Sequence, residues 1–191
     1  MANKSKKEHI LHVASGLFNK QGIRGTGVDQ VVAESKIAKM TLYNHFPSKD
    51  DLVLAYLTKQ DDEWRSWFEA SVDSRAQTPK DKLLAMFDAL GEWFGEKEFT
   101  GCAFIKAASE FGDPAHPYHG AAHGYKLNLR AYIASLSEDF GPADPGALSD
   151  SLYLLVEGAI MAAMLQTAAR PALHARRAAE ILIAHHAPAA V

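Results

Sequence analysis

The sequence predicts an all-α protein of about nine helices, and three observations support this. Apolar residues recur at helical spacing along most of the 191 residues. No run of β-branched residues alternates with polar ones, so no strand is expected. The composition, 48% hydrophobic and 23% charged, is that of an ordinary globular protein with enough apolar side chains for a core. A disordered, collagen-like or disulfide-dense chain is therefore excluded.

Each of the first four expected helices has a recognisable start or stop. Ser, Thr and Asp side chains cap helix starts, and glycine suits a helix end. The first helix follows the capping box Ser5-Lys6-Lys7-Glu8 and stops at Gly22. The next three are expected over 27–35 with Thr26 as cap, over 38–45, and from Ser48 as cap to about residue 72.

The remaining five helices are separated by polar, glycine-rich or proline-rich breaks. Thr78-Pro79, Asp144-Pro145 and Pro171 each supply a proline at a helix start, the first two with a capping side chain before it. The first of these helices is predicted to begin at Pro79. The next two are predicted to run from about Cys102 to Phe111 and from about Pro117 to Phe140. The last two are predicted to run from Pro145 to about Ala169 and from Pro171 to near His186.

Charge is divided unevenly along the chain. Residues 1–49 carry eight Lys or Arg against three acids, a local charge of +5, while the whole chain has a formal net charge of −3. The other 142 residues therefore carry −8. A basic end on an acidic body is typical of a nucleic-acid-binding domain joined to a body that does not bind DNA. A chance asymmetry of the surface would give the same totals.

Two short helices joined by a tight turn, at 27–35 and 38–45, have the proportions of a helix-turn-helix. In that motif the second helix enters the major groove of DNA, and its early residues contact base edges. Ile37, Leu42 and Phe46 share one face of the second helix and are expected to face the protein interior. The polar side is left for DNA.

The polar side carries the residue types that bind DNA. Lysine and asparagine bind guanine and adenine edges, methionine contacts a thymine methyl, and threonine reaches a base or a phosphate. Tyrosine, histidine and a further lysine donate to phosphate oxygens, as do amides at helix starts. For Tyr43 and His45 a purely structural position is the alternative. The expected contacts are Lys39, Asn44, Met40 and Thr41, then Tyr43, His45, Lys49, Thr26 and Val28.

The segment Thr41-Leu42-Tyr43-Asn44-His45-Phe46-Pro47-Ser48-Lys49-Asp50-Asp51-Leu52 resembles the signature of the tetracycline-repressor (TetR) family, and the likeness extends over about residues 5–57. The resemblance implies a DNA-binding domain at 1–47 and a helical effector-binding and dimerisation domain at 48–191. It implies a ligand-responsive regulator, most often a repressor, that binds a pseudo-palindromic double-stranded operator as a homodimer through its last two helices. A small-molecule effector would release it by pivoting the fourth helix.

Two positions depart from the family pattern. Lys36 stands in the turn where glycine is usual, and a left-handed lysine costs about 1 kcal/mol relative to glycine. Ala38 stands where serine commonly caps the recognition helix, which forgoes roughly 0.5–2 kcal/mol. Both changes loosen the turn and leave the fold in place.

The body offers weaker signals for an effector. Aromatic and sulfur-containing side chains lie in the helices that would surround a family-type pocket, and such side chains line small-molecule sites. The ordinary alternative for most of them is the core, and a lone cysteine is more often a small buried hydrophobe. The residues expected to line the effector site are Trp93, Cys102, Phe104, Phe111, His123, Tyr153 and Met161.

Three histidines leave two further interpretations open. His116, His119 and His123 share a face if the segment is helical throughout, and Glu110 and Asp113 lie just upstream. They would make the chain a metal-sensing regulator or a metal-dependent hydrolase. Pro117 and two glycines weaken that register, so solvated or pocket-lining histidines are the simpler interpretation and no metal site is predicted.

No motif of an enzyme is present: the chain lacks a nucleophile elbow, a P-loop, an HExxH helix and a dinucleotide-binding glycine turn. We therefore expect no catalytic residues and no cofactor. The single cysteine cannot form an intrachain disulfide. The apolar stretch from Leu152 to Ala169 carries Glu157 and Gln166, so a buried helix is expected rather than a membrane span. A cytoplasmic protein is the default expectation.

Overall fold

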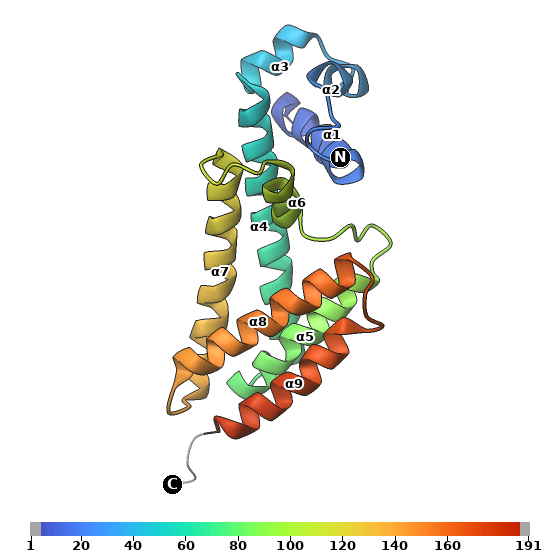
Figure 1. Cartoon of the computed structure of the whole chain (residues 1–191). Helices are drawn as coiled ribbons and strands as arrows, with labels where there is room; N and C mark the ends of the chain where they lie inside the picture. The colour runs from blue at the N-terminus through green and yellow to red at the C-terminus, as the bar shows by residue number, and fades with distance from the viewer. Residues whose placement is uncertain (1–4, 188–191) are drawn as a thin grey trace. The chain divides into compact units, whose positions relative to one another are not determined.

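A computed structural model describes residues 5–187, and over this range the chain forms nine helices and no strand (Figure 1). The all-α prediction is confirmed. The helices are α1 (Lys6–Gln21), α2 (Val28–Ser35), α3 (Lys39–His45), α4 (Lys49–Arg75), α5 (Pro79–Gly95), α6 (Ala103–Glu110), α7 (Pro117–Phe140), α8 (Pro145–Met164) and α9 (Pro171–His185).

Several predicted helix signals are confirmed by hydrogen bonds. Ser5 and Glu8 form the capping box of α1, and Gly22 follows its end with φ +82°. The Ser48 hydroxyl accepts from the Asp51 amide at the start of α4 at 3.0 Å. Thr78 caps α5 with its side chain, and Pro79 occupies the first turn. Local sequence therefore determines where these helices begin.

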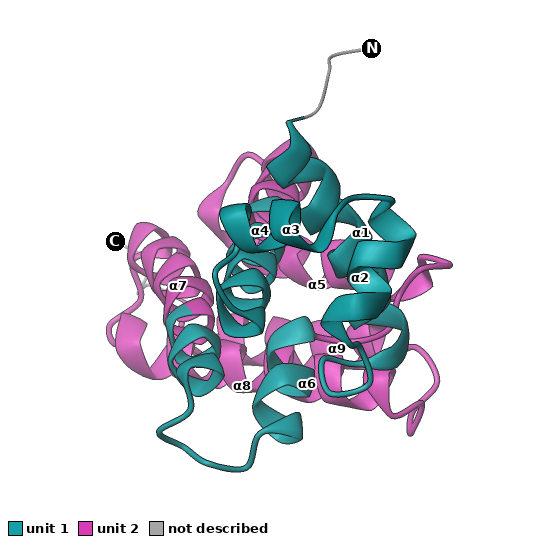
Figure 2. Ribbon diagram, turned by 90° about the horizontal axis from the view of Figure 1, so that it is seen from above, with its two compact units in different colours: residues 1–63, 103–124 teal, residues 64–102, 125–191 magenta. Residues whose placement is uncertain are grey.

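The chain divides into two compact units (Figure 2). The first comprises the described residues up to Glu63 together with Ala103–Gly124, so it holds α1 to α3, the first half of α4, α6 and the start of α7. Within it α1, α2 and α3 pack against one another. Its buried apolar residues include Ile10, Phe18, Ile23, Val31, Leu42, Phe46 and Leu52.

The second unit comprises Trp64–Cys102 and the described residues from Tyr125 onward. Helix α9 packs against both α5 and α8, and the three run side by side in Figure 1. The core of this unit includes Leu83, Met86, Leu90, Leu152, Val156, Ile160 and Ile183. Aromatic side chains gather in the same unit: Trp64 stacks on Phe68 with centroids 4.6 Å apart and meets Trp93 edge-on.

Helix α8 ends earlier than predicted. We expected it to reach about Ala169, but it stops at Met164. Gln166 and Arg170 are both left-handed, with φ values of 53° and 51°, and Pro171 then opens α9. A left-handed residue ends a helix, and residues preceding a proline disfavour helical geometry. The turn was not predicted because the segment is rich in alanine, which favours helix.

By length and composition, α8 is the one helix of the described residues that could cross a membrane. A core helix of a globular protein passes the same test. Here α8 packs against α5 and α9, and its buried residues lie along one side, as expected for a core helix.

Candidate nucleic-acid interface

Helix α3 is held to the protein by two buried anchors. Leu42 is fully buried, and Phe46, the residue that ends the helix, is 2% exposed. Lys7 of α1 places its ammonium 5.6 Å from the centroid of the Phe46 ring. Ile37, which was also expected to face inward, is half-buried. The predicted apolar face therefore lies against the rest of the first unit.

The opposite side of α3 faces solvent, and we call its exposed residues Lys39, Met40, Tyr43 and Asn44 the recognition surface. Met40 is 70% exposed, so its thioether is accessible to a binding partner. Thr41 and His45 are half-buried and flank this surface. The arrangement leaves an amide, an ammonium, a phenol and a thioether free of the core on one short helix.

The turn between α2 and α3 has the left-handed residue expected of it. Lys36 has φ 54° and ψ 42°, and its amide donates to the carbonyl of Ala33 at 3.2 Å. The lysine therefore carries the conformational cost from which glycine would be exempt. Ala38 caps α3 with no side-chain hydrogen bond, as its lack of a hydroxyl implies.

Lys39 is paired rather than isolated. Its ammonium lies 2.7 Å from a carboxylate oxygen of Asp29, in the first turn of α2, and both side chains are mostly exposed. The hydrogen bond and the charge of Asp29 raise the pKa of Lys39 above its usual value. The lysine thus stays charged, and a solvent-exposed pair of this kind is weak enough to exchange for another anion.

Thr26 does not cap α2, and this prediction is wrong. Gly27 is the N-cap and makes no side-chain hydrogen bond. Thr26 is fully buried, and its hydroxyl donates to the carbonyl of Gly22 at 2.7 Å. The hydroxyl is therefore used to close the turn between α1 and α2, while Val28, half-buried, begins the helix.

Lys49 is tied to the same turn. Its ammonium donates to the carbonyl of Ile23 at 2.6 Å. Burial lowers the pKa of Lys49, and the charges of Glu110 and Asp50 oppose that shift. The side chain expected to bind phosphate therefore also holds the turn that precedes α2.

Comparisons with known proteins agree with this geometry. The family description "Bacterial regulatory proteins, tetR family" matches residues 10–56. The HTH-type transcriptional regulator YjdC of Escherichia coli (strain K12) is 28% identical over 181 residues, 93% of each chain. LmrA of Bacillus subtilis (strain 168), also an HTH-type transcriptional regulator, is 26% identical over 91% of this chain and 94% of its own. A solved TetR-family regulator from Streptomyces coelicolor, SCO4454, has a TM-score of 0.85 at 28% identity over 95% of each chain.

This chain belongs to the TetR family. It is accordingly a helix-turn-helix transcriptional regulator, and α3 is the helix predicted to enter the major groove.

A contact that sequence reasoning missed joins α6 to the turn between α1 and α2. The Glu110 carboxylate accepts from the amides of Ile23 at 3.0 Å and Arg24 at 2.7 Å, and we call this pair of bonds the Glu110 clamp. The Arg24 guanidinium also lies 4.9 Å from the Phe111 ring centroid. No local signal could predict a contact between residues 87 positions apart.

A second contact fixes the start of α7 to the start of α4. The Tyr118 hydroxyl donates to a carboxylate oxygen of Asp50 at 2.6 Å. Burial first, and then this carboxylate, raise the pKa of Tyr118, so its phenol stays protonated. Together with the Glu110 clamp, this bond explains why residues 103–124 cluster with the DNA-binding helices in this TetR-family chain.

The residues expected at the effector site are divided between the two units. Trp93, Cys102, Tyr153 and Met161 belong to the second unit, and Phe104, Phe111 and His123 to the first. Cys102 and Phe104 are buried, whereas Met161 and His123 are exposed. Burial raises the pKa of Tyr153, to which Glu157 adds. The fold thus gives these seven residues different surroundings.

The three histidines do not form a metal site. Pro117 begins α7, so His116 lies outside the helix, where it packs on Phe111. His119 bonds through its Nε2 to the carbonyl of Phe111 at 2.6 Å, and His123 is exposed. Within residues 5–187, no group of three or more His, Cys, Asp or Glu side chains could hold a metal ion. The metal-sensing and hydrolase alternatives therefore find no support.

Proposed function

We propose that this protein is a cytoplasmic, homodimeric repressor that binds a pseudo-palindromic operator and leaves it when a small molecule binds. The observation that carries the proposal is the recognition surface: polar side chains point outward on a helix whose other side is anchored by Leu42 and Phe46. A helix anchored in this way presents its outward side chains to the major groove.

Each group on the recognition surface has a distinct role. Asn44 is suited to a bidentate contact with adenine, and Lys39, once it leaves Asp29, to guanine. Met40, with its exposed thioether, suits a thymine methyl. Tyr43 and Lys49 donate to phosphates and so position the helix without choosing the sequence. Thr41, His45 and the amides around Val28 complete the contacts, with Thr26 holding the turn beneath them.

Dimerisation is supported by an exposed apolar stripe on α8 and α9. Leu154, Met161 and Leu165 follow one another at helical spacing on or just after α8, and Leu154 is 68% exposed. Ile181 of α9 is 72% exposed. Large apolar side chains clustered on a surface mark an interface, and a two-fold axis would place the same stripe of both copies together.

The operator would first be obtained by selecting genomic fragments with the purified protein. Asn44→Ala and Lys39→Ala are then expected to change which sequences are selected, while Tyr43→Ala weakens binding to all of them. Loss of one lysine–phosphate contact, such as the one proposed for Lys49, reduces the slope of log K against log salt concentration by about 0.9. Lys80→Ala, an exposed lysine at the start of α5, is the matched control for charge. Unchanged selection and affinity in all the α3 variants would refute the groove assignment.

Release by a ligand requires that the ligand bind one arrangement of the two DNA-binding domains more tightly than the other. Helix α4 belongs partly to the first unit and partly to the second, so it carries a change in the body to the DNA-binding helices. The dimer is tested by sedimentation: Leu154→Lys is expected to give monomers that bind the operator far more weakly. A dimer that survives this substitution and binds normally would refute the proposed interface.

A further inference from the structure

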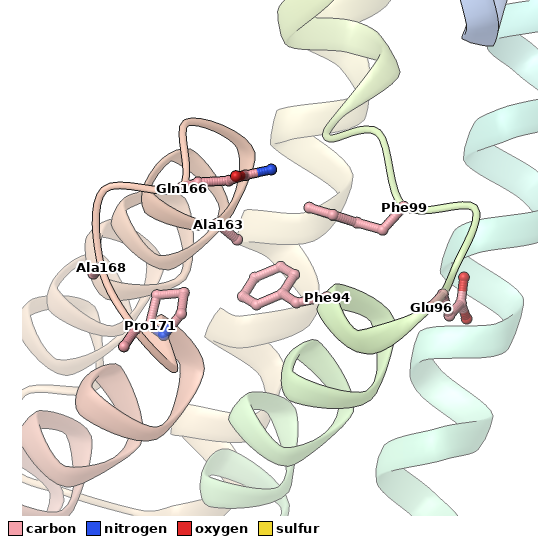
Figure 3. A pocket seen from close by; sticks show the side chains of 8 residues that line it. Phe94, Glu96, Phe99, Ala163, Gln166, Ala168 and Pro171 are labelled. Carbon is pink, nitrogen blue, oxygen red and sulfur yellow. The ribbon is translucent and has the colours of Figure 1, made fainter.

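The second unit contains a cavity of about 490 Å³ where α5 ends and α8 connects to α9 (Figure 3). Figure 3 shows the Phe94 ring in its middle, with Pro171 beside it and Phe99 and Gln166 reaching across the top. The volume lies within the range of sites that bind small organic molecules, roughly 300–1,000 Å³. None of the seven residues expected at the effector site lines this cavity.

The walls of the cavity are fixed by packing. The Phe94 and Phe99 rings lie 5.3 Å apart, and Trp93 meets Phe99 edge-on at 5.0 Å. Further along, Gly101 has φ +93°, and a Cβ atom there would lie 2.6 Å from Cγ of Met164. The segment that follows α5 therefore lies in close contact with Met164 at the end of α8. The aromatic wall is therefore held in place by both neighbouring segments.

The lining indicates which ligands the cavity accepts. Phe94, Phe99 and Pro171 present flat apolar surfaces, to which alanine methyl groups add. The Gln166 amide offers one donor group and one acceptor. Glu96 is the only ionisable side chain among the lining residues. A carboxylate repels anions, whereas aromatic faces attract cations and bind neutral rings.

We propose that this cavity binds a small aromatic molecule that is uncharged or positively charged, and that it is an effector site of the regulator. The second clause depends on the proposed function, whereas the first can be measured without DNA. Phe99 lies four residues before α6 begins at Ala103, and α6 ends at Glu110, which holds the turn before α2. A ligand that moves Phe99 thus acts on the start of a short segment that ends at the DNA-binding helices.

The test uses the full-length protein and two fluorescent probes that share one ring framework. N-phenyl-1-naphthylamine is uncharged, and 1-anilinonaphthalene-8-sulfonate adds a single sulfonate. The uncharged probe is expected to bind once per chain and at least tenfold more tightly than the sulfonate. Glu96→Gln is expected to reduce that preference to less than threefold, because it removes the repulsive charge.

Blocking the cavity separates this site from other apolar surfaces. Ala168 lines the cavity in an exposed turn, so Ala168→Trp is expected to fill it without disturbing the core and to weaken the uncharged probe at least tenfold. Ala143→Trp, in the exposed turn before α8, is the matched control and should bind like the parent. Unchanged binding in Ala168→Trp, or equal affinity for the two probes in the parent, would overturn the site.

A second copy of the chain is the other candidate occupant. If sedimentation shows that Ala168→Trp converts dimers to monomers while probe binding is lost, the cavity is a dimer contact and the proposal fails. In the operator arm, saturating uncharged probe should weaken operator binding at least fivefold in the parent but not in Ala168→Trp. Probe binding with no such effect overturns the effector assignment. Absence of operator binding before any probe is added would instead overturn the proposed function.

Discussion

The Glu110 clamp predicts that one carboxylate of α6 controls the turn before α2. Glu110 accepts from two consecutive amides, those of Ile23 and Arg24. A Cβ atom on Gly22 would lie 2.9 Å from Oε1 of the same carboxylate, so the carboxylate fits closely against the backbone. Ile23 itself is buried and its carbonyl accepts from Lys49. Removing Glu110 therefore leaves the turn with fewer bonds on one side.

The magnitude follows from the two hydrogen bonds. A hydrogen bond to a charged group contributes about 1.5–3 kcal/mol, and the one to the Arg24 amide is weakened by its exposure to solvent. We take about 2 kcal/mol for both together, which corresponds to about a 30-fold change in an equilibrium. Glu110→Ala should therefore increase local opening of the turn by about 30-fold. Glu110→Gln keeps one amide oxygen as acceptor, so its local opening of the turn should lie between that of the parent and that of Glu110→Ala.

Two measurements test this. Hydrogen exchange followed by mass spectrometry should show faster exchange in the peptide containing Ile23 and Arg24. Operator affinity should fall about tenfold in Glu110→Ala, because the turn positions α2 and, through it, α3. The salt slope should stay unchanged, since no phosphate contact is lost. Glu138→Ala, at an exposed glutamate of α7, removes the same charge and is the control.

Three results would contradict this reasoning. Unchanged exchange in Glu110→Ala would mean that the two hydrogen bonds do not hold the turn. Faster exchange with unaltered operator affinity would mean that the turn does not position α3 for DNA. Equal effects in Glu138→Ala would assign the change to overall charge.

Three further substitutions test other features. Lys36→Gly should stabilise the protein by about 1 kcal/mol and raise Tm by about 2–4 °C, because glycine adopts the left-handed conformation without strain. An unchanged or lower Tm would contradict the strain argument. Tyr118→Phe loses the bond to Asp50 and should lower the free energy of unfolding by about 1–2 kcal/mol in urea titrations, and a loss below 0.3 kcal/mol would refute it. The buried Tyr132 hydroxyl has no hydrogen-bond partner among the described residues, so Tyr132→Phe should cost less than about 0.5 kcal/mol at pH 7. Burial, with Asp73 and Glu69, raises the pKa of Tyr132, so above about pH 10 the unfolded chain loses its phenol proton first and stability falls. The free energy of unfolding of Tyr132→Phe should therefore fall less steeply with pH than that of the parent above about pH 10. Equal slopes in the two proteins would contradict this.

Much of the DNA-binding half could be predicted from local sequence, because its determinants lie close together in the chain. The capping box at Ser5, the stop at Gly22 and the apolar pair Leu42 and Phe46 each act within one or two helical turns. The left-handed conformation of Lys36 was suggested only by the family pattern, which usually has glycine in this turn. Thr26 is an example of a residue for which local reasoning fails. Its hydroxyl donates to the carbonyl of Gly22 instead of accepting from an amide at the start of α2, and both possible partners lie within a few residues of it.

The body could be predicted only as a set of helices. The cavity depends on Gln166 and Arg170 adopting left-handed conformations in an alanine-rich stretch, which ended α8 early. Phe94 and Phe99 were indistinguishable by sequence from aromatic core residues. Side chains become cavity walls when neighbouring segments fail to fill a space, and that property belongs to the packing of several helices together.

The grouping of residues 103–124 with the DNA-binding helices is the property most relevant to regulation. Sequence reasoning placed the boundary of the DNA-binding domain at residue 47, where the helix-turn-helix ends. The Glu110 clamp and the Tyr118–Asp50 bond add α6 and the start of α7 to the same compact unit. The chain therefore passes between the two units within α4, at the start of α6 and within α7. A ligand in the body has one covalent route to the recognition helix, through α4, and two further routes, through α6 and α7, that end in the hydrogen bonds of Glu110 and Tyr118. The route through α6 is the shortest from Phe99, which is why Glu110 and the cavity should be tested in the same protein.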